Sequence, residues 1–207
     1  MRTTIYLLPL LAIAWSMTSC ATNENSVSME DKTIMEVTTF SIGPSANPAD
    51  FANLDAQVEA NFTSKRPGFI SRQSGINEEG NYAVVVYWEN MADADASMSK
   101  FMDAPSVSDY TKMIDASTMN MSRYAVDKPL EANDSRFVEI MSFDVKDGEN
   151  MEEFNATNQE VETQFTGTRD GFIQRLTGVN EAGQQVVAVY WENKVLSDAS
   201  LEPFMIA

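Results

Sequence analysis

The sequence predicts an α+β fold built from two similar units, each with the order strand, helix, strand, strand, helix, strand. The first observation is a repeat: the stretch VVVYWEN at residues 84–90 returns as VAVYWEN at residues 187–193. The same offset of 103 residues relates residues 34–104 to residues 137–207 without a gap. A fixed offset over this length indicates a duplicated unit. The second observation is that the apolar spacing within each copy switches between the periods of strands and helices.

The first strand is expected at residues 35–42, and a helix is expected from residue 48 onward. Asn47 stands where a helix would begin, and Pro48 follows at the first helical position. The helix then carries apolar side chains at helical spacing, namely Phe51, Leu54, Val58 and Phe62. The second copy repeats this pattern at Asn150, Glu153, Phe154, Val161 and Phe165.

The other elements expected in the first copy are strands at 68–72 and 82–90, a helix at 91–102, a short helix capped by Ser106, and a last strand at 119–126. A polar turn at residues 77–80 joins the first two of these strands and predicts a hairpin. This order of elements is the split βαβ, or ferredoxin-like, unit. Its helices cover one face of the sheet, and the other face is too apolar to remain in water. We therefore expect the two copies to pack sheet against sheet as an intramolecular pseudo-dimer.

We divide the chain into a signal peptide (1–19), a tether (20–33), a first unit (34–126), a linker (127–136) and a second unit (137–207). Because the second unit stops at the counterpart of Ala104, we expect it to lack the last helix and strand that residues 105–126 give the first. Either the sequence is a fragment, or the second sheet lacks its final strand. In the second case the strand at residues 138–145 would lie at an open edge, and open edges recruit other strands.

The N-terminal segment is typical of an exported protein. Arg2 is its only charge before an apolar run that is too short to span a bilayer, and this pattern indicates a signal peptide. Residues 17–20, MTSC, resemble a bacterial lipobox, although Met17 stands where leucine is usual. We expect acylation of Cys20 and a lipid-anchored protein of the bacterial cell envelope, with the fold beside the membrane. The alternative is an ordinary cleaved signal followed by an incidental thiol.

Composition excludes one class of partner. The chain has 31 acidic and 14 basic residues, a net charge of −17, and such a charge repels nucleic acid. The acidic residues are best read as a solvated surface. Cys20 is the only cysteine, so no intramolecular disulfide can form.

Two stretches of the repeat carry a resemblance to a known family. Pro67-Gly68-Phe69-Ile70 before a turn, followed by residues 84–90 leading into a helix, resembles the antibiotic biosynthesis monooxygenase family of the dimeric α/β-barrel superfamily. The likeness covers both copies, and its motifs are features of the fold. It implies a tandem pair that forms the barrel usually made by a homodimer. Some members of that family oxidise phenolic or quinol substrates without metal or flavin, others degrade haem, and many have no known activity, so fold alone does not give function.

The candidate site residues recur in both copies. Those expected to be catalytic are Arg72, Trp88 and Asn90, with Arg175, Trp191 and Asn193 in the second copy. Those expected to contact the substrate are Glu36, Tyr87, Glu139 and Tyr190. In the chemistry that the resemblance implies, the aromatic residues form a platform, the arginine holds an anion, and the asparagine or glutamate contacts protons and oxygen.

Each candidate also has a structural reading. Trp88 would be a large core residue, the arginine and glutamate would pair with each other across a sheet, and Asn90 would cap a helix. The chain has no histidine, so the axial histidine of the haem-degrading members has no counterpart and a histidine base is excluded. Its 13 methionines could suit Cu(I), but most lie at core spacing and no second cysteine is present. We expect no metal and no cofactor.

Two functions remain open from the sequence. One is a cofactor-independent monooxygenase acting on a small electron-rich aromatic molecule of the phenol or quinol type. The other is a non-catalytic module that binds a small apolar molecule or a partner at the membrane surface. An open cavity beside Trp88 or Trp191 would be the most informative observation.

Overall fold

The first unit has the predicted order of elements. It contains β2 (Ile34–Ile42), α1 (Pro48–Asn61), β3 (Phe69–Ile76), β4 (Tyr82–Trp88), α2 (Met91–Phe101), α3 (Ser108–Met113) and β5 (Ile114–Val126). The second unit contains β6 (Phe137–Phe143), α4 (Met151–Glu160), β7 (Phe172–Val179), β8 (Gln185–Trp191) and α5 (Lys194–Phe204). A short strand β1 (Thr4–Leu7) precedes both. The computed structural model describes residues 4–7, 29, 31–131 and 133–204.

The predicted helix starts are confirmed in both units. The Asn47 side chain accepts hydrogen bonds from the backbone N–H groups of Ala49 and Asp50 at 2.8 and 3.3 Å. Asn150 caps α4 in the same way. These caps satisfy N–H groups that have no partner within the helix.

Two local predictions in the first unit were wrong. Ser106 does not cap α3, because a short 3₁₀ turn at Pro105–Val107 leads into that helix instead. The last strand also begins at Ile114 and not at residue 119. Its early part pairs with β2 through the backbone, as at Asp115 opposite Ser41, while several of its side chains stay exposed. A strand segment whose side chains stay exposed shows no alternation of apolar and polar residues. The sequence pattern therefore could not reveal this first part of β5.

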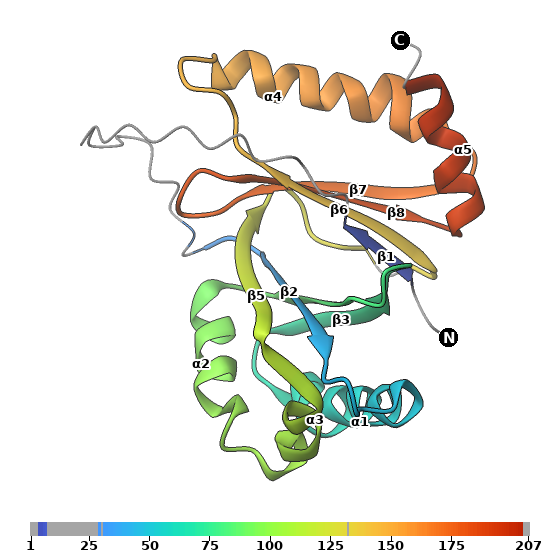
Figure 1. Ribbon diagram of the computed structural model, residues 1–207. Coiled ribbons are helices and arrows are strands. Elements are labelled where there is room, and N and C mark those ends of the chain that lie inside the picture. Colours follow the sequence, from blue (N-terminus) through green and yellow to red (C-terminus); the bar gives the residue numbers. More distant parts are fainter. Residues whose placement is uncertain (1–3, 8–28, 30, 132, 205–207) are drawn as a thin grey trace.

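The molecule has four layers, with helices outside and two sheets inside (Figure 1). Helices α1, α2 and α3 cover the outer face of the first sheet, and α4 and α5 cover the second. The strand order is β1-β6-β8-β7-β5-β2-β4-β3, so the strands of the first unit lie in the order last, first, third and second. This architecture is two ferredoxin-like units packed as an intramolecular dimeric α/β barrel.

The two sheets are joined at one edge by β5 and β7. Ala125 pairs with Val179, and Val126 pairs with Gly178. A Cβ atom at Gly178 would lie 2.7 Å from the carbonyl oxygen of Ala125, closer than real Cβ contacts allow. The junction therefore requires glycine at this position.

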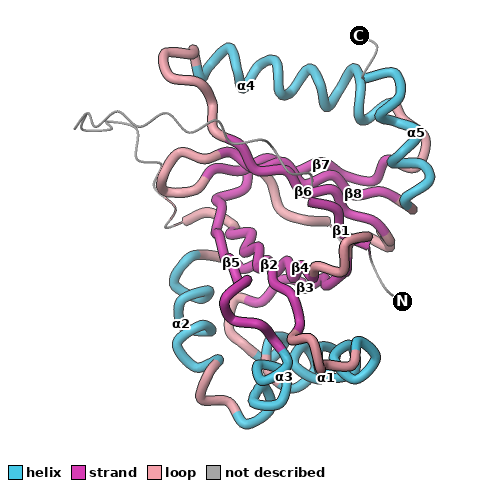
Figure 2. The backbone as a smooth tube through the Cα atoms, viewed as in Figure 1, coloured by secondary structure: helices cyan, strands magenta, loops and turns pink. Residues whose placement is uncertain are grey.

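Alternation along the strands separates the apolar core between the two sheets from the apolar core beneath the helices of each unit. On β2 the side chains of Met35 and Val37 face the second sheet, while those of Glu36 and Phe40 face the helices. The inter-sheet core combines residues of both units, including Val85, Tyr87, Val138, Ile140 and Tyr190. This shared core lies between the strands of the two units, which face each other in Figure 2, and it makes the pair one packed structure.

The expected open edge of the second sheet is occupied in the structure. Strand β6 pairs with β8 on one side and, in parallel, with β1 on the other. Strand β1 also lies against β3, the far edge of the first sheet. Within the described residues no strand follows α5, so β1 holds the place that a fourth strand of the second unit would take. The prediction that residues 138–145 lie at an unpaired edge was therefore wrong.

The two units meet at a buried tyrosine pair that can be tested by unfolding. The hydroxyl oxygens of Tyr87 and Tyr190 lie 2.5 Å apart, and Tyr87 also contacts the sulfur of Met35 at 3.0 Å. Tyr87→Phe leaves the Tyr190 hydroxyl buried without this partner, and we expect a loss of about 1–3 kcal/mol in the free energy of unfolding. Tyr190→Phe should cost less, because Tyr87 keeps Met35.

Urea unfolding of the two single variants and the double variant checks this coupling. The double variant should lose less than the sum of the single losses, since both hydroxyls are then gone. Additive losses of equal size would contradict a hydrogen bond between the units.

Candidate functional site

A cavity of about 280 Å³ lies between the outer face of the first sheet and helices α1, α2 and α3. Its wall is mostly apolar and aromatic, including Phe40, Phe62, Trp88, Phe101 and Tyr110. A small number of polar side chains also reach it, namely Glu36, Thr38, Thr63, Arg72, Ser97 and Thr111. An apolar cavity with few polar groups is typical of a small-molecule site.

Glu36 is a buried acid on this wall. Arg123 of β5 donates from Nε to its carboxylate at 2.6 Å, and the same guanidinium contacts Asp95 of α2 at 2.5 Å. Burial raises the pKa of Glu36 above the ordinary 4.5, although Arg123 opposes this shift. Glu36 therefore holds a proton more readily than an exposed glutamate does.

Trp88 lies beside Glu36 with an unsatisfied donor. The indole is 2% exposed and stacks edge-on against Phe69, and its Nε1 has no hydrogen-bond partner within normal distance. The indole is still close enough to the Glu36 carboxylate for a weak hydrogen-bond interaction, which slightly lowers the pKa of that acid. A buried donor without a partner costs free energy, so this corner of the cavity favours an added acceptor.

Arg72 forms a second polar cluster at the cavity. Its guanidinium donates to both carboxylate oxygens of Asp55, at 2.5 and 3.2 Å, and the Ser74 hydroxyl donates to the same carboxylate. Burial alone would lower the pKa of Arg72, but Asp55 holds it above the ordinary value. Burial and the Asp55 charge also raise the pKa of Tyr110. Arg72 is thus already paired, which does not fit the expected role of an anion clamp.

The second unit keeps part of this arrangement with different partners. Trp191 donates from Nε1 to Glu139 at 3.2 Å, and Ser197 donates to the same carboxylate at 2.5 Å. Ala94 stands where the second unit has Ser197, and Asp55 stands where it has Asn158, which accepts from Arg175 at 2.5 Å. The lining residues of the described cavity all belong to the first unit.

Seven of the ten candidates do not line the cavity, namely Tyr87 and Asn90 of the first unit and the five candidates of the second unit. Tyr87 and Tyr190 point into the inter-sheet core, because they sit on the opposite strand face from Trp88 and Trp191. Asn90 caps α2 by accepting from the Asp93 N–H at 2.9 Å, and Asn193 accepts from the Leu196 N–H at 3.1 Å. For Asn90 and Asn193 the capping alternative describes the contacts that are present.

Glu36 and Arg72 both line the cavity, but they do not pair with each other as the structural reading suggested. Each has a partner that the repeat did not reveal, Arg123 and Asp55 respectively. Arg123 lies beyond the repeated region, so it had no second copy to draw attention to it. Asp55 follows Leu54 on the apolar stripe of α1 and is buried. An acidic residue within an apolar stripe is the feature of the sequence that could have indicated a buried partner for Arg72.

The family of the chain follows from a match in both units. The family described as Domain of unknown function (DUF3835) matches residues 32–104 and 139–195, which is more than half of the chain. The chain belongs to the DUF3835 family. The DUF3835 match covers β2 to α2 of the first unit and most of β6 to β8 of the second. No curated protein matches the chain.

Solved structures confirm the fold expected from the resemblance. This DUF3835 protein is similar to a candidate monooxygenase of Fusobacterium nucleatum, with a TM-score of 0.61, 15% identity, and coverage of 82% of this chain and 80% of that chain. A candidate monooxygenase of Lactobacillus acidophilus has a TM-score of 0.58, 11% identity, and coverage of 83% and 82%. An anthrone oxidase-like protein has a TM-score of 0.55, 14% identity, and coverage of 85% and 80%. At these identities the likeness shows the fold alone.

The Arg72–Asp55 pair gives a stability prediction with an internal control. Asp55→Ala leaves a buried guanidinium without its carboxylate, and we expect a loss of about 3–5 kcal/mol in the free energy of unfolding. Asn158→Ala removes a neutral partner from the equivalent Arg175, and about 1.5–3 kcal/mol is expected. Thermal and urea unfolding of both variants measure the difference. Equal losses would contradict a dominant ion pair in the first unit.

Proposed function

We propose that the first unit binds a small electron-rich aromatic molecule of the phenol or quinol type and oxidises it with molecular oxygen, without metal or flavin. The observation that carries this proposal is Glu36, an acid with a raised pKa in the wall of an apolar cavity beside Trp88. The names of the similar structures, two candidate monooxygenases and an anthrone oxidase-like protein, support the same reaction class.

The reaction needs a base more than it needs a redox centre. A phenolic hydroxyl that donates to Glu36 transfers its proton and becomes an electron-rich anion. In an anthrone-type substrate a methylene carbon loses two hydrogens and gains one atom of O₂, and the second atom leaves as water. The substrate supplies all four electrons. The protein's tasks are to exclude water, remove the proton and stabilise the anion.

Glu36 has two neighbours suited to these tasks. Arg123 favours the charged carboxylate and so limits the rise in pKa that burial causes, and Trp88 Nε1, which has no partner within normal hydrogen-bond distance, can donate to Glu36 or to a bound oxygen after a small movement. In the second unit Glu139 already receives the indole hydrogen bond of Trp191. We therefore assign proton transfer to Glu36 and not to Glu139.

The two glutamates allow a matched test. Oxygen uptake is measured over a panel of anthrones and quinols with metal chelated. Glu36→Gln should lower the rate roughly a hundredfold or more, as expected for loss of a general base. Glu139→Gln should leave the rate unchanged. If both variants lose activity equally, or neither does, Glu36 is not the base.

The raised pKa of Glu36 predicts a pH dependence. Because the folded protein holds this proton more tightly than an unfolded chain, ionised Glu36 costs stability as pH rises above the ordinary 4.5. The rate should rise over the same range and level off, with a midpoint above 4.5. Stopped-flow oxygen uptake gives the profile, and Glu36→Gln should lose this rising limb. A midpoint at or below 4.5 would contradict a buried base.

We also propose that the protein is a lipoprotein of the cell envelope, anchored through Cys20. The sequence of residues 1–20 supports this, and Cys20 lies outside the described residues. Cleavage before Cys20 would remove residues 1–19 and with them β1, so the edge of β6 that β1 covers in the structure would be unpaired in the anchored protein. Within the described part of the chain, no helix is long and apolar enough to cross a membrane. Cys20→Ala should release the protein from membranes in cell fractionation, and intact-mass analysis of the native protein should show acyl chains. Membrane retention of the variant would overturn the anchor.

The second candidate function is binding without catalysis. The pairing of Arg72 with Asp55 favours it, because the cavity then lacks a free cation to stabilise an anion. Binding of panel members without oxygen uptake by the unmodified protein would establish this alternative.

A further inference from the structure

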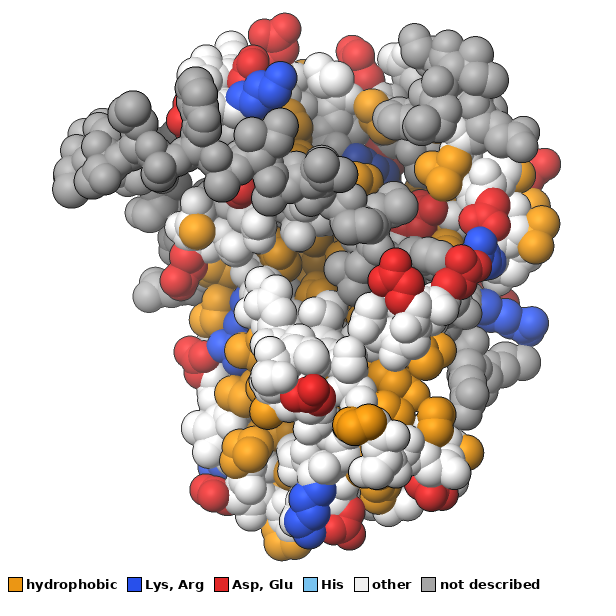
Figure 3. Space-filling view, viewed as in Figure 1, with side chains coloured by type: hydrophobic (Ala, Val, Ile, Leu, Met, Phe, Trp, Pro, Cys, Tyr) orange, Lys and Arg blue, Asp and Glu red, His pale blue; other side chains and the backbone are white. Residues whose placement is uncertain are grey.

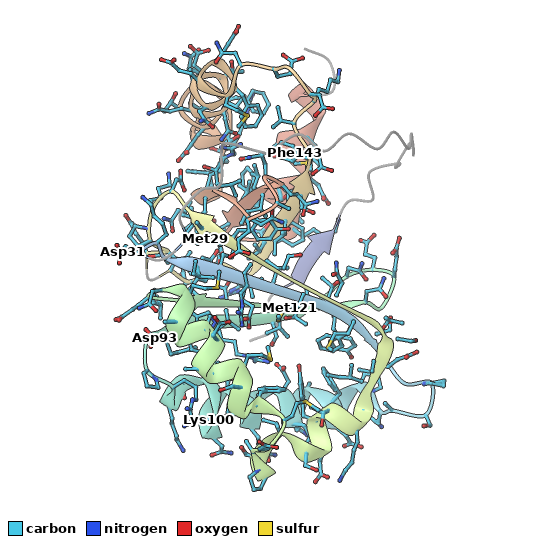
Figure 4. All side chains as sticks on the ribbon, turned by 90° about the vertical axis from the view of Figure 1, so that its left-hand side faces the viewer. Met29, Asp31, Asp93, Lys100, Met121 and Phe143 are labelled. Carbon is cyan, nitrogen blue, oxygen red and sulfur yellow. The ribbon has the colours of Figure 1, made fainter. Side chains whose placement is uncertain are left out.

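The mouth of the cavity is bordered by four methionines. Met98 and Met102 come from the end of α2, and Met119 and Met121 come from β5. They are 37%, 73%, 54% and 40% exposed, whereas Trp88 and Val86 deeper in the cavity are almost fully buried. In Figure 4, β5 with Met121 and α2 with Asp93 and Lys100 border the space that the cavity occupies.

The order of side chains from floor to mouth follows from the packing of α2 beside β5. Arg123 of β5 contacts Asp95 and Met91 of α2. The next side chains on the same face of β5 are Met121 and then Met119. The next turns of α2 on the same side bring Met98 and then Met102. The floor is therefore charged and paired, and the walls toward solvent are thioethers.

This arrangement forms an apolar path from the buried floor to the surface. Figure 3 shows hydrophobic side chains exposed on the first unit, the lower half of that view. Grouped exposed apolar residues mark binding surfaces, and methionine is suited to adaptable ones because it is unbranched and flexible. A ligand confined to the floor would not use these four side chains.

The charges at the floor select an uncharged head group. Arg123 is compensated by Glu36 and Asp95, and Arg72 is compensated by Asp55, so neither cation is free for an anionic ligand. A hydroxyl group suits the floor, because it can donate to Glu36 and accept from a neighbouring donor.

We propose that the ligand is an amphiphile, with a neutral hydroxyl-bearing aromatic head at Glu36 and Trp88 and a hydrocarbon tail that leaves the cavity across Met98, Met102, Met119 and Met121. This rests on the proposed function for the head group and adds the tail. The occupant of the mouth is thus part of the ligand, not a second copy of the chain or a partner helix.

A ligand series tests the tail directly. Hydroquinones with alkyl chains from methyl to octyl are titrated by calorimetry under anaerobic conditions, and oxygen uptake is measured separately. Each methylene buried against the mouth should tighten binding roughly fourfold, until the chain extends beyond the methionines. Met98→Gln/Met121→Gln keeps the side-chain length but adds polarity, so it should flatten this dependence on chain length.

Two exposed methionines of the second unit give the control. Met141→Gln/Met151→Gln changes side chains with 37% exposure that do not line the cavity, and the dependence on chain length should persist. Light scattering during the titration reports whether a second copy covers the mouth.

The outcomes separate the two proposals. Binding that tightens with chain length without oxygen uptake would overturn the oxygenase and support the amphiphile. Binding and oxygen uptake that do not depend on chain length, or that depend on it equally in both double variants, would overturn the amphiphile alone. Failure of every compound to bind would overturn both.

Discussion

The structure depends on the burial of the second face of each sheet. A ferredoxin-like unit covers one sheet face with its helices, and the side chains on the other face, such as Met35, Val85 and Val138, are too apolar to remain in water. Packing the two sheets together removes both faces from solvent at once. Because that contact stabilises the pair, the space between the first sheet and its helices can remain partly empty without loss of the fold.

The two copies divide the available roles. Among the described residues, only the first copy has a further helix and strand, α3 and β5, after its second long helix. Helix α3 supplies Tyr110 to the cavity wall, and β5 supplies Arg123, which pairs with Glu36. The second copy keeps the tryptophan and the glutamate but joins them in a direct hydrogen bond. In the first copy Arg123 takes that carboxylate, and the indole nitrogen is left with only a weak interaction with Glu36 beyond normal hydrogen-bond distance. The carboxylate is thus paired mainly with an arginine in the first copy and with the indole and Ser197 in the second.

The sequence predicted the fold well because the repeat tests every assignment twice. Asn47 and Asn150, for example, begin equivalent helices from the same local signal. The site was less predictable because its partners come from outside the repeat or from distant elements. Arg123 reaches Glu36 across 87 residues, and no local pattern encodes that contact. Tyr87 was assigned to the site by its position next to Trp88, although adjacent strand residues face opposite sides of a sheet.

Strand β1 was not predicted, because residues 4–7 lie within the segment interpreted as a signal peptide. Its place is nevertheless explained by the symmetry of the barrel. Strand β1 lies between β6 and β3, where a fourth strand of the second unit would otherwise lie. Its pairing with β6 uses backbone hydrogen bonds, which depend little on the identity of the side chains.

Gly178 also bears on the symmetry of the barrel. It is the residue that lets β5 approach β7 closely, and its counterpart in the first copy, at the same offset, is Gly75 on β3. In a symmetric dimer of single units both junctions would be crossed by a last strand, and both would require glycine. The present chain has such a crossing at Gly178, whereas β3 lies against β1. Gly75 thus places on β3 the residue type that the β5–β7 junction requires, at a seam that no last strand crosses in the described residues.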